Sequence, residues 1–273
     1  MIIRLIQTLR GLVRDTWGNR AITWELAKRD LHKKYKGAAL GVLWAGAHPI
    51  TYVCVYWFAV SIGLRGGRSE TNGFPYILWL IPGMFAWQTI SSAFSEGGNS
   101  IRSHRELVTK TVFPLITIPQ FSIISLFFVH VGLMVFALAL FLVLGYPPTM
   151  YWLQLPYYMA ASFIFCVVVA TFFSALTAYS RDLVQFIRTL TQILFWFTPI
   201  LWPITNVSGT LASILKLNPI VYLVEGYRAS MIYQTWFFQK PMWTLYFWVA
   251  TAAFALVTVV VWTRMSKDFA DVL

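Results

Sequence analysis

The chain has 273 residues, of which 58% are hydrophobic and only 11% are charged, and its mean hydropathy is +0.66. Soluble domains carry about 25% charged residues, so this composition excludes a soluble globular protein and indicates lipid as the solvent. The net charge of +11 does not indicate nucleic-acid binding, because the basic residues gather before the first long apolar run. Basic flanks of that kind favour a cytoplasmic position beside anionic lipid headgroups.

The N-terminal region, residues 1–36, is predicted to form amphipathic helices. Apolar side chains recur at helical spacing from Ile2 to Val13, and Trp17, Ala21 and Trp24 belong to a second apolar stripe. Such helices lie in the headgroup plane of a membrane. Two interpretations stay open for this region, namely a simple membrane anchor or a docking surface for a soluble partner.

Apolar runs free of charge predict six transmembrane helices, because about 20 helical residues cross the hydrocarbon core. The expected spans cover residues 37–64, 73–95, 114–144, 151–178, 186–203 and 241–263. Sixteen of the 21 Lys and Arg residues fall on the side of the two termini, which places both termini in the cytoplasm and the chain in the plasma membrane. No soluble domain or repeat is visible, so residues 1–273 are expected to form one all-α integral membrane domain.

The segment 204–230 does not fit a simple loop or a span. It is apolar in pieces that Pro and Gly interrupt, which predicts a re-entrant pair of half-helices on the external side, between spans five and six. Glu225 and Arg228 are three residues apart, where an ion pair is expected on a helix. Alternatively, Arg228 binds a substrate phosphate, and Arg65 and Arg68 are further phosphate candidates.

The segment 97–110 joins spans two and three on the cytoplasmic side. Two glycines precede Asn99 and Ser100, either of which can cap a short polar helix. The helix is interpreted either as a solvated connection or as a coupling helix that sits in a groove of an ATPase. Its candidate contact residues are Ser100, Arg102, His104, Arg105, Glu106 and Lys110.

Further cytoplasmic candidates lie at helix ends. The pairs Arg29-Asp30 and Arg181-Asp182 either brace helix ends against headgroups or relay the motion of a partner, and Lys34 and Tyr35 follow the first pair closely.

The chain lacks the residues that would let it supply its own energy. No Lys directly follows a Gly, so the phosphate-binding loop of an ATPase is absent. The central parts of the predicted spans hold no carboxylate for ion-coupled transport. The remaining acidic residues are scattered, which argues against an enzyme or a metal site. The energy must therefore come from another chain, or the protein is a passive conduit.

Four stretches occur in an order that resembles one family. They are RDLHKKYKGAALGVLW with the following His48-Pro49-Ile50, then YSRD, FTPILWP, and Asn218-Pro219 followed by EGYR. Together they resemble the permease subunits of ABC-type exporters for polysaccharides and teichoic acids. Ala38 departs from the pattern, since many members have Ser there. The local sequences at 55–67, 227–238 and 268–273 are similar to those of the branch that exports wall teichoic acid.

The resemblance implies a homodimer that works with two copies of an ATPase subunit, which would bind ATP and Mg while this chain holds no cofactor. It implies a polymer substrate on a polyprenyl diphosphate lipid. It also makes 97–110 the coupling helix, 17–36 an ATPase contact and 204–230 an external gate, with Asn218, Pro219, Glu225 and Arg228 as gate residues. Alternatives are an O-antigen, capsule or small-molecule exporter, and a membrane scaffold that transports nothing.

Aromatic residues supply the candidate channel lining. His48, Tyr52 and Tyr56 recur every fourth residue and share one helix face, and Phe195, Trp196 and Trp202 are the candidates from span five. Aromatic faces can stack on successive flat groups of a polymer without fixing one register, as they do on nucleic acid bases. The alternative is ordinary packing or an interfacial belt.

Overall fold

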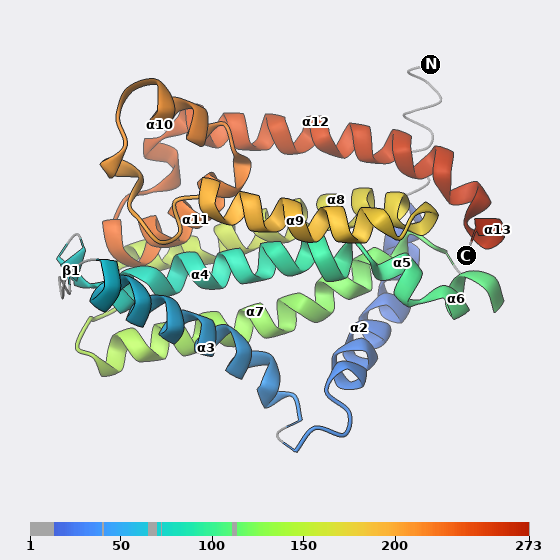
Figure 1. Cartoon of the computed structure of the whole chain (residues 1–273), viewed down its shortest axis with the longest axis horizontal. Coiled ribbons are helices and arrows are strands. Elements are labelled where there is room, and N and C mark those ends of the chain that lie inside the picture. The colour runs from blue at the N-terminus through green and yellow to red at the C-terminus, as the bar shows by residue number, and fades with distance from the viewer. Residues whose placement is uncertain (1–13, 40, 65–69, 72, 111–113, 273) are drawn as a thin grey trace.

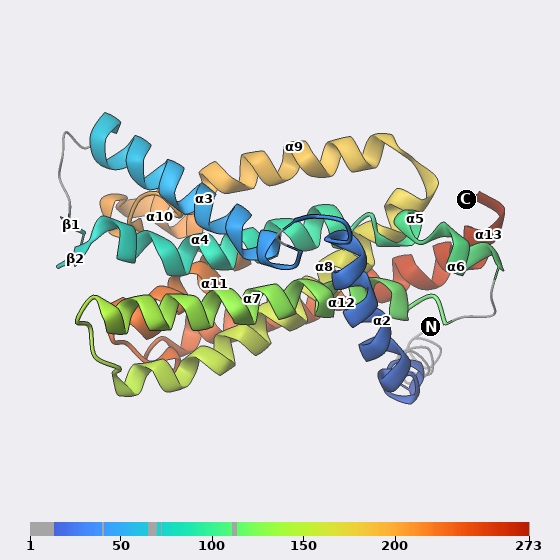
Figure 2. The ribbon, with the colours of Figure 1, turned by 90° about the horizontal axis from the view of Figure 1, so that it is seen from below.

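Long apolar helices dominate the computed structural model, which describes residues 14–39, 41–64, 70–71, 73–110 and 114–272. The helices run side by side along the long axis of the molecule (Figures 1 and 2). Among the described residues, five helical stretches are long and apolar enough to cross a membrane: Leu43–Gly63, Tyr76–Gly97, Thr117–Val143, Met150–Tyr179 and Pro241–Asp268. The predicted all-α membrane architecture is confirmed at this level.

These stretches are built from α-helices with short irregular extensions. They comprise α3 (Leu43–Phe58) with a π-turn (Ala59–Leu64), α4 (Tyr76–Ser92) with a π-turn (Ala93–Gly97), α7 (Thr117–Val143), a 3₁₀ turn (Met150–Gln154) with α8 (Leu155–Tyr179), and α12 (Pro241–Met265) with a 3₁₀ turn (Ser266–Asp268). Between α7 and α8, Gly145 has φ +84°, a conformation that glycine adopts without strain.

The fifth predicted span, 186–203, is shorter in the structure. Its helix, α9, covers Asp182–Phe197 and is only 16 residues long. At 1.5 Å per residue it reaches about 24 Å, less than the roughly 30 Å of a hydrocarbon core. The helix ends because Pro199 forces the preceding Thr198 into an extended conformation (φ −103°, ψ 132°). The number of six spans therefore stays a prediction.

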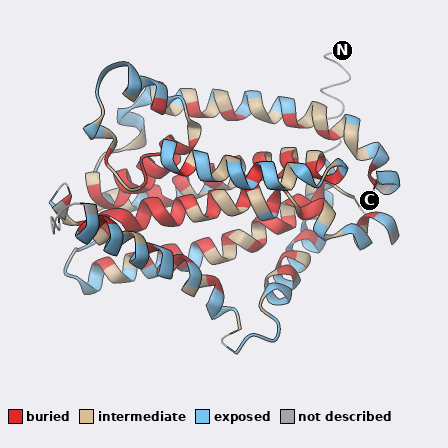
Figure 3. Ribbon diagram, in the orientation of Figure 1, coloured by how far each residue is buried: buried red, intermediate tan, exposed pale blue. Residues whose placement is uncertain are grey.

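The core of the bundle forms around α4, which packs on α3, α7 and α11. Nearly all of α4 is buried, whereas α12 and α3 expose much of their apolar surface (Figure 3). Apolar helices with exposed sides suit a lipid environment, where apolar surface needs no cover.

One end of the bundle carries α2 (Arg20–Lys34), α5 (Ser100–Ser103), α6 (Arg105–Lys110) and α13 (Phe269–Val272). The helix α2 lies across α7, and α5 packs on α8 and α7. The single helix predicted within 97–110 is wrong in detail, since the chain leaves the helical conformation at His104 (φ −114°, ψ 35°) and forms two short helices.

The opposite end carries a two-stranded antiparallel hairpin of β1 (Glu70–Thr71) and β2 (Phe74–Pro75) together with the segment 204–230. That segment holds α10 (Gly209–Lys216) and α11 (Pro219–Arg228), which a π-turn (Ala229–Tyr233) extends; short 3₁₀ turns cover Ile204–Asn206 and Phe237–Gln239. Residues 220–228 of α11 are all buried, whereas α10 is mostly exposed. Gly226 lies against the ring of Tyr158, where a Cβ would collide with ring atoms.

Candidate functional site

Three cavities that share lining residues run along one side of α4. The aromatic cavity, about 480 Å³, lies between α3, α4 and α9. The middle cavity, about 400 Å³, shares His48 and Gln88 with it. The charged cavity, about 510 Å³, shares Glu96 with the middle cavity and lies at the end that carries α2 and α5. The three together form a furrow, and we treat it as the candidate functional site.

The aromatic cavity brings together five of the six predicted channel residues, His48, Tyr52, Tyr56, Phe195 and Trp196. Their spacing of four residues places the three α3 rings along one face, tilted to one another, with centroids 4.7 Å apart for the first pair and 6.3 Å for the second. The ring of Tyr56 then reaches that of Phe195 on α9 at 5.2 Å. Trp196 is 64% exposed, so its ring is available for contact.

The sixth predicted residue, Trp202, does not line the cavity. It lies beyond the end of α9, among the turn and bend residues that follow Phe197, so it does not continue the helix of the predicted span. Sequence reasoning missed the wall that α4 contributes, which consists of Met84, Trp87, Gln88 and Ser91. Among the described residues that line the aromatic cavity, none is Asp, Glu, Lys or Arg.

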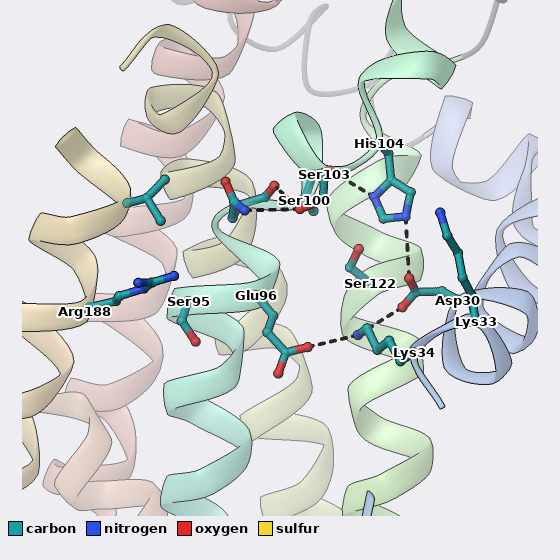
Figure 4. A pocket seen from close by; sticks show the side chains of 12 residues that line it. Asp30, Lys33, Lys34, Ser95, Glu96, Ser100, Ser103, His104, Ser122 and Arg188 are labelled. Carbon is teal, nitrogen blue, oxygen red and sulfur yellow. Dashed lines mark hydrogen bonds and ion pairs between the residues drawn. The ribbon is translucent and has the colours of Figure 1, made fainter. Parts of the chain in front are cut away.

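In the charged cavity, Lys34 lies between two carboxylates that come from different elements (Figure 4). Lys34 Nζ lies 3.1 Å from the Asp30 carboxylate on its own helix and 3.1 Å from that of Glu96 beyond α4. His104 Nε2 lies 3.5 Å from the other oxygen of Asp30. These contacts tie α2, the end of α4 and the break between α5 and α6 to one another.

Burial alone would raise the pKa of Asp30, but the hydrogen bond with His104 and the charge of Lys34 outweigh it and lower this pKa from 3.8 to about 2. Burial would likewise lower the pKa of Lys34, yet the two nearby carboxylates raise it. Asp30 therefore stays a carboxylate and Lys34 a cation at neutral pH.

Asp30 forms its ion pair with Lys34, one helical turn away, while its neighbour Arg29 is exposed. The bracing or relay role of the Arg29-Asp30 and Arg181-Asp182 pairs stays a prediction. Arg181 and Asp182 are both exposed and form no described ion pair, and the backbone N–H of Asp182 donates to Ser180 Oγ at the start of α9. Tyr35 lines the middle cavity.

The predicted coupling residues fall into an inner and an outer group. Ser100 is buried in the charged cavity, and Arg102 donates to the carbonyl of Thr177 on α8 at 3.0 Å. Arg105 and Glu106 are exposed on α6, which Lys110 ends. The inner residues thus anchor the segment to the bundle, and the outer ones face away from it.

The predicted gate residues hold α11 in place. The Asn218 side chain accepts a hydrogen bond from Ile220 N–H at 3.0 Å and donates to Thr198 Oγ1 at 3.2 Å, and Pro219 occupies the first turn of α11. Glu225 and Arg228 form an ion pair at 2.8 Å.

Arg228 is fully buried, and its guanidinium has further protein partners. It donates to the carbonyls of Pro199 and Ile200 and lies 3.6 Å over the ring of Trp79. Gly83 makes room for it, since a Cβ there would lie 2.6 Å from the guanidinium. The structure favours the ion-pair interpretation of Arg228 over phosphate binding. Arg65 and Arg68 lie outside the described residues.

A buried polar chain that sequence reasoning missed joins four helices. His130 on α7 contacts Thr89 on α4 at 2.8 Å and Tyr227 on α11 at 2.7 Å, and Tyr227 donates to Ser162 on α8 at 3.3 Å. The signal available in the sequence was His130, the single histidine of the predicted span 114–144. Among the described residues, no group of three or more His, Cys, Asp or Glu could hold a metal ion.

Comparison with known proteins finds relatives that share one name and a family model that matches most of the chain. The chain is 27% identical over 224 residues to an O-antigen export system permease protein RfbA of Myxococcus xanthus, covering 80% of this chain and 83% of that protein. It is 26% and 28% identical to two proteins of the same name from Klebsiella pneumoniae, covering 74% of this chain and 77% of each. The family model of ABC-2 type transporters matches residues 22–232. The chain, a multi-pass membrane protein, therefore belongs to the ABC-2 type transporter family.

Proposed function

We propose that this chain is the transmembrane subunit of an ATP-driven exporter that moves a lipid-linked cell-surface polysaccharide outward. The observation that carries the proposal is the aromatic cavity, whose described lining consists largely of aromatic rings and the amides of Gln88 and Gln192, without a charged residue. Uncharged flat faces suit the C–H faces of sugar rings, and they bind successive units without a fixed register. The relatives named as O-antigen export permeases support a polysaccharide as the cargo.

The energy comes from a separate ATPase subunit in this proposal, with two copies beside two copies of this chain. ATP and Mg bind to that partner, because this chain has no Gly-Lys pair for a phosphate loop. The partner docks at the end that carries α2, α5 and α6, where Arg105 and Glu106 are exposed.

In the proposed membrane arrangement, both termini are cytoplasmic, and α9 with the residues that follow it forms the fifth of six crossings, before α12. The segment 204–230 is the external gate, re-entrant from outside, with α11 buried in the bundle. ATP binding in the partner moves α5, and the contacts of His104, Asp30, Lys34 and Glu96 pass that motion to α2 and α4. The furrow between α3, α4 and α9 then opens for the polymer.

The cargo has two candidates. The names of the relatives favour an O-antigen-type polysaccharide. Wall teichoic acid is the second candidate, and it is supported only by the resemblance of the local sequences at 55–67, 227–238 and 268–273. A scaffold that transports nothing is the alternative from another class.

Depletion of the chain in cells tests the proposal. Lipid-linked polymer should accumulate inside the cell and disappear from the surface, and the chemical identity of the accumulated polymer names the cargo. Re-expression of the Tyr52→Ala/Tyr56→Ala variant should restore little export, while Phe58→Ala, an exposed residue of the same helix outside the cavity, should restore it fully. Unchanged surface polymer after depletion would refute the proposal and favour the scaffold.

A further inference from the structure

A buried polar chain holds the inner end of α11, the end that carries Tyr227 and Arg228. His130 Nδ1 on α7 lies 2.8 Å from the Thr89 hydroxyl on α4, and its Nε2 lies 2.7 Å from the Tyr227 hydroxyl. The Tyr227 hydroxyl continues the chain to Ser162 on α8, at 3.3 Å. One imidazole therefore lies at the centre of contacts that join four helices.

This chain lies at a depth where polar groups are costly. His130 is halfway along α7, Thr117–Val143, and its side chain is fully buried, as is that of Tyr227. Polar groups near the middle of a membrane span are rare and mark functional positions, because hydrocarbon offers them no partner. An apolar side chain would satisfy ordinary packing at position 130, so the reason for a histidine lies in its hydrogen bonds.

The hydrogen atoms of this chain have two complete arrangements. In the first, the Thr89 hydroxyl donates to the Phe85 carbonyl of its own helix, at 3.1 Å. His130 Nδ1–H then donates to Thr89, and Nε2 accepts from Tyr227. In the second, Thr89 donates to Nδ1 and Nε2–H donates to Tyr227, whose own hydrogen points to Ser162. In both arrangements, residue 130 must donate on one side and accept on the other, which a neutral imidazole does and an apolar side chain does not.

The chain connects the wall of the furrow to α11. Thr89 lines the middle cavity, next to Gln88, which the middle and aromatic cavities share. At the other end of the chain, Tyr227 belongs to the stretch 220–228, all of which is buried inside the bundle (Figures 1 and 3). The adjacent Arg228 binds the carbonyls that follow α9. The inner end of α11 is thus fixed by two polar contacts, and the contact through His130 is the one that leads back to the furrow.

We propose that His130 is the residue that positions the gate helix α11. Through Tyr227 it holds the inner end of α11 against α7, and through Thr89 it ties that end to the α4 wall of the furrow, so that a displacement of α4 moves the gate. The inference rests on the proposed function for the role of 204–230 as the gate. His130 acts through its two neighbours and touches no cargo, since its side chain is fully buried.

Thiol labelling of the complete exporter, permease with its ATPase, in proteoliposomes tests the position of α11. Val224→Cys places a reporter at a fully buried position of this helix, in a parent chain that carries Cys54→Ala/Cys166→Ala. A membrane-impermeant maleimide, added on the side opposite the ATPase, should label the parent slowly in the absence of nucleotide. His130→Leu and Tyr227→Phe should each raise the labelling rate about three- to twentyfold, the range implied by the loss of one interhelical hydrogen bond in a membrane. Labelling at the parent rate in both variants would overturn the proposal.

Three comparisons separate positioning by hydrogen bonds from ordinary packing. His130→Gln keeps a donor and an acceptor, so its labelling rate should lie closer to that of the parent than the rate of His130→Leu does. Thr258→Val on α12 removes a buried hydroxyl whose described hydrogen bond stays within its own helix, and it should leave the rate unchanged. Because His130 and Tyr227 share one contact, the variant His130→Leu/Tyr227→Phe should label no faster than His130→Leu alone. Multiplied effects in the double variant, or equal rates for His130→Gln and His130→Leu, would overturn the role of the hydrogen bonds.

Export in the same proteoliposomes separates this inference from the proposed function. His130→Leu should keep the ATP hydrolysis of the parent but export several-fold less polymer per ATP, because the gate no longer follows α4. Export per ATP equal to that of the parent, in an assembled complex, would overturn the coupling and leave the exporter intact. No export by the parent complex would remove the proposed function, while the labelling rates would still decide whether His130 holds α11.

Discussion

Replacement of Arg228 by Met should destabilise the chain severely, because this guanidinium joins three elements. It binds Glu225 on its own helix, the carbonyls of Pro199 and Ile200 after α9, and the carbonyl of Trp79 on α4 at 3.4 Å. Removal leaves the Glu225 carboxylate, 7% exposed, without its cation. Breaking a buried ion pair in this way costs about 3–5 kcal/mol.

Two further variants separate the charge from the geometry. Arg228→Lys keeps the charge but loses the fork that reaches the two carbonyls, so about 2 kcal/mol should be lost, as for one charged hydrogen bond. Glu225→Gln/Arg228→Met leaves no unpaired charge and should be more stable than Arg228→Met alone, with a coupling of about 1–3 kcal/mol.

The assay is the unfolding of the purified chain in detergent, followed by tryptophan fluorescence against denaturant. Arg264→Met, on α12 and not fully buried, is the matched control and should lie within about 0.5 kcal/mol of the wild type. If Arg228→Met were equally stable, the guanidinium would not be the link between α4, α9 and α11, and the reasoning on this contact would be refuted.

Three other predictions concern separate regions. The folded-state pKa of Asp30, about 2, lies below the ordinary 3.8, so this group adds about 2 kcal/mol of stability above pH 4 that is lost as the pH falls toward 2; an Asp30→Asn variant, followed by unfolding from pH 7 to 2, should lack this slope, and an unchanged slope would contradict the pairing. Gly226→Ala should lower the stability by about 1–3 kcal/mol through collision with the ring of Tyr158, and Tyr158→Leu in the same chain should restore part of it in thermal unfolding. Trp196→Ala should reduce polymer export several-fold, as the loss of a stacking ring worth about 1–3 kcal/mol implies, whereas Trp57→Ala outside the cavity should not; equal effects would argue against the aromatic cavity.

The helices that could span a membrane were predictable from the sequence because charge-free runs of adequate length have few alternatives. The stripe of His48, Tyr52 and Tyr56 could be read from a spacing of four, which places rings on one helix face whatever the neighbours are. The predicted channel role of these rings stays a prediction, although the structure gathers five of the six residues in one cavity.

Other features depend on contacts that the sequence does not encode locally. Asp30 and Lys34 are one helical turn apart, but their contacts with His104 and Glu96 join segments that are distant in sequence. Trp202, a channel candidate of the fifth predicted span, does not line the aromatic cavity because α9 ends at Phe197. Arg228 was expected to pair with Glu225, but its carbonyl partners Pro199, Ile200 and Trp79 lie 29, 28 and 149 residues away in sequence and could be found only in three dimensions.

Translocation in proteoliposomes tests the central claim most directly. The chain and its ATPase subunit would be reconstituted with a lipid-linked polysaccharide whose sugars are labelled, and a membrane-impermeant glycosidase would report which face carries the polymer. The account predicts that ATP moves the polymer to the face opposite the ATPase, and that the Tyr52→Ala/Tyr56→Ala variant moves little despite intact assembly. Polymer that stays on its original face in the presence of ATP, with an intact and hydrolysing complex, would contradict the account.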